Sequence, residues 1–150
     1  LSGRKDAGKM GRGYIRFEDI EKIVGRENMI CFCELMKEKF EQTDEKERIK
    51  IEFIEHLLYE DYEYQFENGG EIPKTFDNLL ILEDAVGTKM FGVLLDKFRT
   101  KRLSVSYGLV RRKLICNDLT NGMRIKEIAE KYNVDIATVY RYRNKIAKRG

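Results

Sequence analysis

The sequence predicts a mainly α-helical protein with one or two short strands and a helix-turn-helix at its C-terminal end. Apolar residues recur at every third or fourth position through residues 17–40 and again through residues 76–98, which predicts amphipathic helices. Residues 101–107 instead alternate apolar and polar side chains, as a strand with one buried face does. After residue 121, turn residues and apolar positions agree with two short helices joined by a tight turn.

Three parts are predicted along the chain. Residues 1–13 are rich in Gly, Lys and Arg with little apolar content, so we expect a flexible basic arm. Residues 14–108 form a helical dimerisation or partner domain, and residues 109–150 form the helix-turn-helix domain. Within the first helix, over residues 17–40, Gly25 is the expected break.

The middle of the chain has weaker patterns. Residues 41–48 are polar and are expected in a loop or the exposed first turn of a helix. Apolar residues at helical spacing predict a helix over residues 49–60, and alternating aromatic residues predict a short strand over 62–66. A turn follows at Asn68-Gly69-Gly70, and Pro73 excludes a helix interior there.

The helix predicted over residues 76–98 has an apolar stripe that is wide for so short a chain. A stripe wider than one chain can cover is typical of a dimer face. We therefore predict a homodimer whose interface is formed by Leu82, Val86, Met90, Phe91, Leu94, Leu95 and Phe98. After the strand over 101–107, Gly108 offers a hinge before a helix over residues 109–120.

Charge is distributed unevenly, although the net charge is only +3. Residues 41–84 contain fourteen Asp and Glu against four Lys and Arg, and residues 99–150 show the reverse ratio. A concentration of positive charge attracts nucleic acid, so we expect the basic end to face a polyanion. The simpler alternative is a pair of solvated surfaces that attract each other, and for the acidic half we favour a solvated surface.

The composition argues against several other functions. No run of about 18 apolar residues is present, so we expect no membrane association and a cytoplasmic location. A zinc site has too few ligands, because His56 is the only histidine and Cys31 and Cys33 point to different faces of a helix. We predict reduced cysteines, no metal, no cofactor and no catalytic residue.

The segment after Gly122 has the spacing of a helix-turn-helix. Ala129 is small enough for two helices to cross at close range, and Asn133 suits a turn that needs a positive φ. The pattern is completed by apolar positions on the inner faces of both helices. Its members are Ile128, Ala129, Asn133, Val134 and Val139. In such a motif the second helix enters the major groove of DNA.

Contacts to DNA are predicted from the side of the last helix that faces away from Val139. Arg141 is suited to guanine and Asn144 to adenine, while Ile136 or Ala137 can contact a thymine methyl group. Tyr140 lies on the same side. Phosphate contacts are predicted for Lys126, Thr138, Arg143, Lys145, Lys148 and Arg149. The alternative for each is an ordinary solvated side chain on a helical hairpin with a basic exterior.

Residues 82–150 resemble the Mor/C family of phage middle- and late-gene transcription activators. The segment "AVGTKMFGVLLDKF" resembles its dimerisation helix and "KRLSVSYG" its strand and hinge. The segment "NDLTNGMRIKEIAEKYNVDIATVYRYRNKI" resembles its DNA-binding end. The resemblance implies a homodimer that grips adjacent segments of double-stranded DNA and recruits RNA polymerase. Residues 1–75 show no such resemblance.

Two other functions remain open at this point. The first is a DNA-binding accessory or recombinase-type protein of a mobile element. A recombinase or nuclease would need clustered carboxylates for metal ions or a nucleophilic Ser or Tyr among arginines. The carboxylates over residues 41–84 are spaced like surface residues instead. A non-DNA adaptor would use the acidic half as a partner contact.

Overall fold

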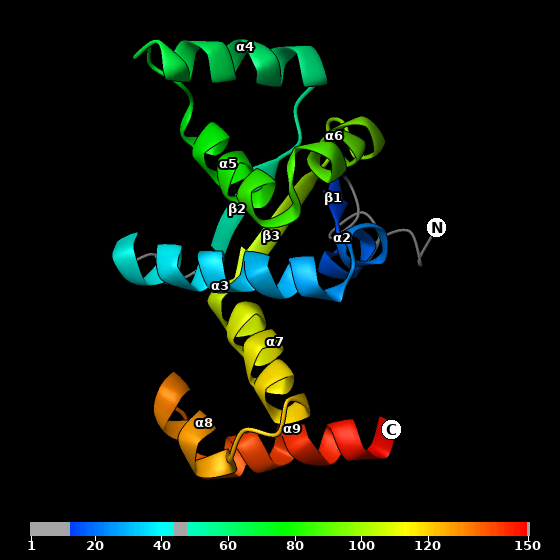
Figure 1. Cartoon of the computed structure of the whole chain (residues 1–150), viewed down its shortest axis with the longest axis vertical. Helices are drawn as coiled ribbons and strands as arrows, with labels where there is room; N and C mark the ends of the chain where they lie inside the picture. The colour runs from blue at the N-terminus through cyan, green and yellow to red at the C-terminus, as the bar shows by residue number, and fades with distance from the viewer. Residues whose placement is uncertain (1–12, 44–47, 150) are drawn as a thin grey trace, which may run out of the picture.

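The computed structural model describes residues 13–43 and 48–149, and confirms a mainly α-helical fold with a few short strands (Figure 1). In chain order its elements are β1 (Tyr14–Ile15), α2 (Phe17–Val24), α3 (Arg26–Thr43), β2 (Arg48–Glu52), α4 (His56–Glu67), α5 (Lys74–Val86), α6 (Thr88–Lys97), β3 (Arg102–Ser106), α7 (Tyr107–Thr120), α8 (Ile125–Tyr132) and α9 (Ile136–Arg149). The predicted basic arm lies outside the described residues except for Gly13. No helix in the described part combines the length and apolar character needed to cross a membrane.

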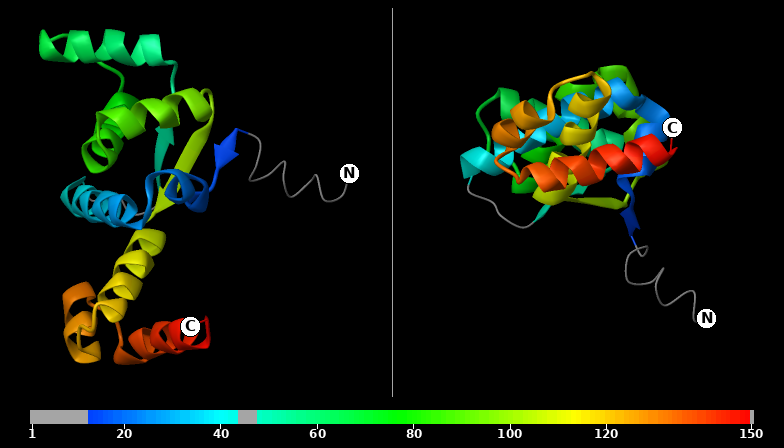
Figure 2. Two further views of the ribbon diagram at one scale, coloured as in Figure 1. Left: turned by 45° about the vertical axis from the view of Figure 1, so that its right-hand side comes forward. Right: turned by 90° about the horizontal axis from the view of Figure 1, so that it is seen from below.

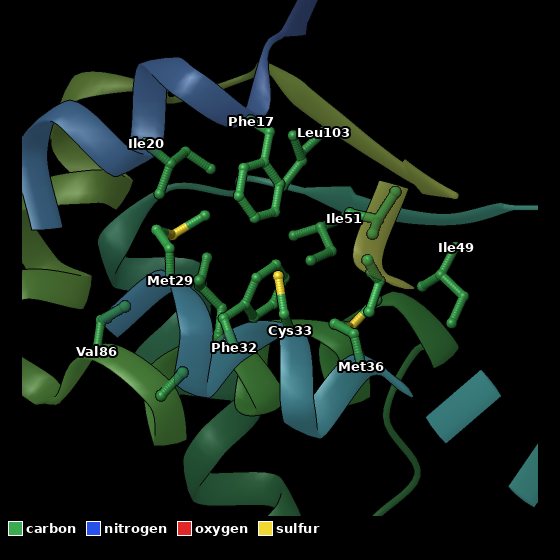
Figure 3. Close-up of a cluster of buried hydrophobic side chains, with 14 of the residues drawn as sticks. Phe17, Ile20, Met29, Phe32, Cys33, Met36, Ile49, Ile51, Val86 and Leu103 are labelled. Carbon is green, nitrogen blue, oxygen red and sulfur yellow. The ribbon is translucent and has the colours of Figure 1, made fainter. Parts of the chain in front are cut away.

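The three strands form one small sheet with β3 in the centre. Strand β1 pairs parallel with β3, and β2 pairs antiparallel with it, so that Ile51 lies opposite Leu103. Alternate side chains of β2 and β3 are buried, as the alternation over 101–107 predicts. The buried sides of α2 and α3 meet these side chains in the core, where Phe32 is fully buried (Figure 3).

Two helix pairs are joined by the same kind of glycine break. Gly25 separates α2 from α3, and Gly87 separates α5 from α6; both have a φ of 89°. In each joint the glycine N–H donates to the carbonyl four residues earlier, of Glu21 and Glu83 respectively, at 2.8 Å. The break at Gly25 is confirmed, whereas the single helix predicted over residues 76–98 is two helices, because Gly87 adopts a φ that L-residues avoid.

The structure corrects two predictions for residues 49–66. The predicted helix over 49–60 begins instead as strand β2, in which Ile49 and Ile51 point to the same buried face. The predicted strand over 62–66 belongs to helix α4. The rings of Tyr59, Tyr62 and Phe66 all pack against Phe76, and their spacing of three and four residues places them on one side of a helix.

The predicted dimer face is buried inside the single chain. Six of its seven residues are at most 8% exposed, and Met90 is partly buried. The six are Leu82, Val86, Phe91, Leu94, Leu95 and Phe98. The stripe is wide because α5 packs against α3 and β2 on one side and α6 on another, so the fold of one chain accounts for it. These side chains therefore offer no surface to a second copy in this conformation.

Replacing Leu94 with Ala tests this placement. Leu94 is fully buried, so Leu94→Ala is expected to lower the free energy of unfolding by about 2–5 kcal/mol. Urea unfolding should give the same loss at protein concentrations about a hundredfold apart, because the contacts lie within one chain. A loss that grows as the protein concentration rises would instead place Leu94 at a subunit interface, because only dimers would lose the contact.

A second prediction concerns Glu63 on α4. Burial, and then the charges of Glu83, Glu67 and Glu60, raise the pKa of Glu63. Because the pKa is raised in the folded state, stability falls as the pH rises from the unfolded-state pKa through the folded-state pKa, and this loss is absent at low pH. Glu63→Gln should therefore raise the melting temperature at about pH 7 and leave it nearly unchanged at about pH 4. An equal effect at both pH values would show that charge is not the cause.

Candidate nucleic-acid interface

Helix α7 begins earlier than the sequence predicts and ends where predicted. The Ser106 hydroxyl oxygen accepts a hydrogen bond from the Leu109 N–H at 3.1 Å, so the helix starts at Tyr107 rather than after Gly108. At the other end, Gly122 has a φ of 87° and the Met123 N–H donates to the Asp118 carbonyl at 3.0 Å. This turn reverses the chain and starts α8 against the side of α7.

The turn between α8 and α9 has the predicted left-handed residue. Asn133 has φ 54° and ψ 53°, and the Val134 N–H donates to the Ala129 carbonyl at 3.0 Å. The Asp135 carbonyl then accepts the first hydrogen bond of α9, from the Thr138 N–H at 3.0 Å. The positive φ predicted for Asn133 is confirmed, and this turn sets the direction in which α9 leaves α8.

Helices α7, α8 and α9 enclose a shared set of apolar side chains. Ile128 and Val139 are fully buried, and Ala129 is 6% exposed. From α7, Leu114 and Ile115 are buried with them. The sequence pattern therefore identified the inner faces of α8 and α9 correctly, and burial of these faces fixes which side of α9 faces solvent.

Asp118 connects α7 to α8 and was not predicted from the sequence. One of its carboxylate oxygens accepts a hydrogen bond from the Tyr132 hydroxyl at 2.7 Å and lies 3.0 Å from the Lys131 Nζ. Burial, together with the bond to Asp118, raises the pKa of Tyr132, so the hydroxyl remains a donor. The sequence signal that pointed to this contact is that Asp118 is the one acidic residue of α7, a helix that carries three basic residues.

Nearly all predicted DNA-contact residues lie at the surface of α9. Ile136 is 46% exposed and Tyr140 is 43% exposed, and Thr138 is partly buried. Lys126 is exposed on α8. The other exposed residues of the predicted set on α9 are Ala137, Arg141, Arg143, Asn144, Lys145 and Lys148. The side chain of Arg149 lies outside the described part of the structure.

A strip of residues lies along the solvent-facing side of α9, away from the buried side on which Val139 lies. Its members are Ala137, Tyr140, Arg141, Asn144 and Lys148, which recur at a spacing of three or four residues; we call them the α9 strip. They share one side of the helix because the opposite side is held in the core by Val139. The α9 strip therefore combines a small apolar group, an aromatic ring, an amide and two cations on one helix face.

Two contacts within α9 hold the cationic side chains in defined positions. The Arg141 Nη2 donates to the Thr138 hydroxyl at 3.0 Å, and the guanidinium carbon of Arg143 lies 4.7 Å from the centre of the Tyr140 ring. A guanidinium has five N–H donors, so each arginine keeps donors for a further partner. Thr138 thus contacts Arg141 in this structure, and its role at a phosphate stays a prediction.

No described residue of the acidic half covers the α9 strip, whose members are all exposed. Helix α9 lies at one end of the molecule, and the acidic helix α4 lies at the other end (Figures 1 and 2). Helix α7 joins α8 and α9 to the rest by packing along α3, where the Arg26 Nη2 donates to Asn117 Oδ1 at 3.2 Å. The basic surface is therefore fixed in orientation and open to a large partner.

No protein-family model, curated protein or solved structure matches this chain. The resemblance to the Mor/C family therefore depends on the sequence motifs alone. Within the described residues, no three His, Cys, Asp or Glu side chains gather closely enough to hold a metal ion.

The turn before α9 provides a stability prediction. Asn133→Val places a β-branched residue at a φ of 54° and is expected to lower the free energy of unfolding by about 1–2 kcal/mol. Asn133→Gly should preserve it to within about 0.5 kcal/mol. The matched control is Asn121→Val, because Asn121 ends α7 at a φ of −84°. Equal losses in urea unfolding for Asn133→Val and Asn121→Val would contradict the role given to the turn.

Proposed function

We propose that this chain is a sequence-specific DNA-binding transcription regulator that acts as a homodimer through α7, α8 and α9. The observation that carries the proposal is the α9 strip, which lies exposed on a helix whose opposite face is fixed in a helix-turn-helix core. An α-helix fits the major groove of B-form DNA, where each base pair displays a distinct set of donors and acceptors.

Within the α9 strip, two side chains have the chemistry of base readers. Arg141 has a planar fork of donors that suits the O6 and N7 atoms of guanine, and Asn144 can pair with the N6 and N7 atoms of adenine. Thr138 supports this reading, since its hydrogen bond to Arg141 limits where the guanidinium can point. Ala137 is small enough to let the helix approach the bases, and its methyl group suits that of thymine.

We assign one cation of the α9 strip and three near it to the DNA backbone. Lys145 and Lys148 lie on α9, and Lys126 lies on α8. Arg143 makes a cation–π contact with the Tyr140 ring, and its five N–H donors allow it to bind a phosphate as well. Such contacts fix the register of the protein on the duplex and carry no sequence information.

Specificity is the reason for proposing two copies. One recognition helix contacts only a few base pairs, and each good base contact supplies about 1–3 kcal/mol of discrimination. Two helices on one site double the sequence that is read. Because the apolar stripe of α5 and α6 is buried within the chain, the contact between the two copies of the proposed dimer lies on another surface. The activator role and the contact with RNA polymerase are proposed from the Mor/C resemblance alone.

Selecting bound sequences from a random library of double-stranded DNA tests the proposal. We expect one enriched motif, repeated at a spacing that reflects two recognition helices. Affinity should fall with salt, with a logarithmic slope of about −0.9 for each phosphate neutralised. If the folded protein binds no DNA at about 50 mM salt, the adaptor function replaces this one. If the protein nicks plasmid DNA in the presence of Mg²⁺ and a variant control does not, the recombinase or nuclease function would be supported instead.

Arg141→Ala tests base reading within the proposed site. We expect this variant to lose about 1–3 kcal/mol of binding free energy on the selected site and much less on unrelated DNA. Lys148→Ala should weaken binding to both duplexes equally. Arg99→Ala is the matched control, because Arg99 is exposed on the other part of the chain. Equal losses on both duplexes for Arg141→Ala would refute its assignment to a base.

A further inference from the structure

Helix α4 is attached to the rest of the molecule along one side only. Tyr59 is 3% exposed, and its ring centre lies 5.1 Å from that of Phe76 and 4.8 Å from that of Phe91. Its hydroxyl also donates to the Glu83 carboxylate. Tyr62 adds a second aromatic contact to Phe76 at 5.8 Å. These contacts fix the rotation of α4 about its own axis and so decide which residues face outward.

The outward side of α4 carries large apolar residues that no other part of the described structure covers. Leu57 is 78% exposed and Tyr64 is 66% exposed, with exposed Asp61 between them at helical spacing. Leu58, at 40% exposed, flanks this side. We call these four residues the α4 face. Leucine and tyrosine are costly to leave in water, and exposed apolar residues that cluster on one face mark an interaction surface.

The same helix is strongly acidic. It carries four carboxylates, those of Glu60, Asp61, Glu63 and Glu67, and neither Lys nor Arg. A binding partner must therefore offer apolar side chains for Leu57 and Tyr64 and cations for the carboxylates around them. Complementary charge speeds the encounter, and the buried leucine and tyrosine supply the lasting contact.

We propose that the α4 face docks a basic surface with apolar residues on a different protein. The inference does not depend on whether α9 binds DNA. A second copy fits poorly in either arrangement. Two α4 helices packed face to face would bring the carboxylates of both helices together without a cation from either one. Packing α4 of one copy on basic α9 of the next would join opposite ends of the molecule, and such head-to-tail contacts form rings or open filaments rather than the two-copy assembly proposed for DNA binding.

A synthetic helical peptide built only from Leu and Lys is the probe, with a Leu and Glu peptide of the same pattern as its counterpart. The full chain should bind the Leu and Lys peptide, and the largest amide chemical-shift changes should fall on α4. The variant Leu57→Ser with Tyr64→Ser should weaken binding by about tenfold or more. It should remain folded, because both side chains face solvent.

The matched control makes the same kind of change at two exposed apolar residues far from α4, as Ile136→Ser with Tyr140→Ser on α9. This control should keep the affinity of the unmodified chain to within about twofold. If the α4 variant and the control bind the Leu and Lys peptide with equal affinity, the proposal is overturned, because the binding would then come from charge attraction without the apolar residues of α4. Concentration-dependent dimers in sedimentation, abolished by the α4 variant, would also overturn it and assign the α4 face to a second copy.

Discussion

Packing of α7 against two groups of elements is the constraint on which the arrangement of this molecule depends. Along one side α7 packs on α3, where the Tyr107 ring contacts that of Phe40, and the Lys113 Nζ lies 3.6 Å from Glu21 on α2. Its far end carries α8 and α9, with Asp118 bonded to Tyr132. The buried apolar residues of both groups form one continuous cluster. A single helix thus fixes the direction of α9 relative to the sheet.

Opposite charges at the two ends of the molecule follow from this arrangement. Acidic helix α4 lies at the end farthest from basic helix α9 (Figure 1). In the electric field of a polyanion such a molecule is oriented before contact, because its acidic end is repelled while its basic end is attracted. Because the proposed DNA surface and the proposed protein-docking surface lie at opposite ends, both can be occupied at the same time. A regulator that bridges DNA and another protein needs this property.

The sequence predicted local features whose cause is local. Asn133 and Gly25 adopt positive φ values, and the buried positions around Val139 follow from helical spacing. Prediction from the sequence failed where contacts between distant elements decide the local structure. Residues 48–52 form a strand because β3 is available to pair with them, and α5 and α6 bury their apolar stripe in their own chain because α3 and β2 lie against it. The contact of Asp118 with Tyr132 joins two helices and leaves no periodic signal.

Mapping a DNA duplex onto the chain by amide chemical shifts tests the central claim most directly. With the selected duplex added, the account predicts the largest changes along α9 from Ile136 to Lys148 and at Lys126, with α4 unaffected. Val139 should shift less than its neighbours on the α9 strip, because its side chain is buried. Changes centred on α4 or on the joint of α2 and α3, with α9 unaffected, would contradict the account.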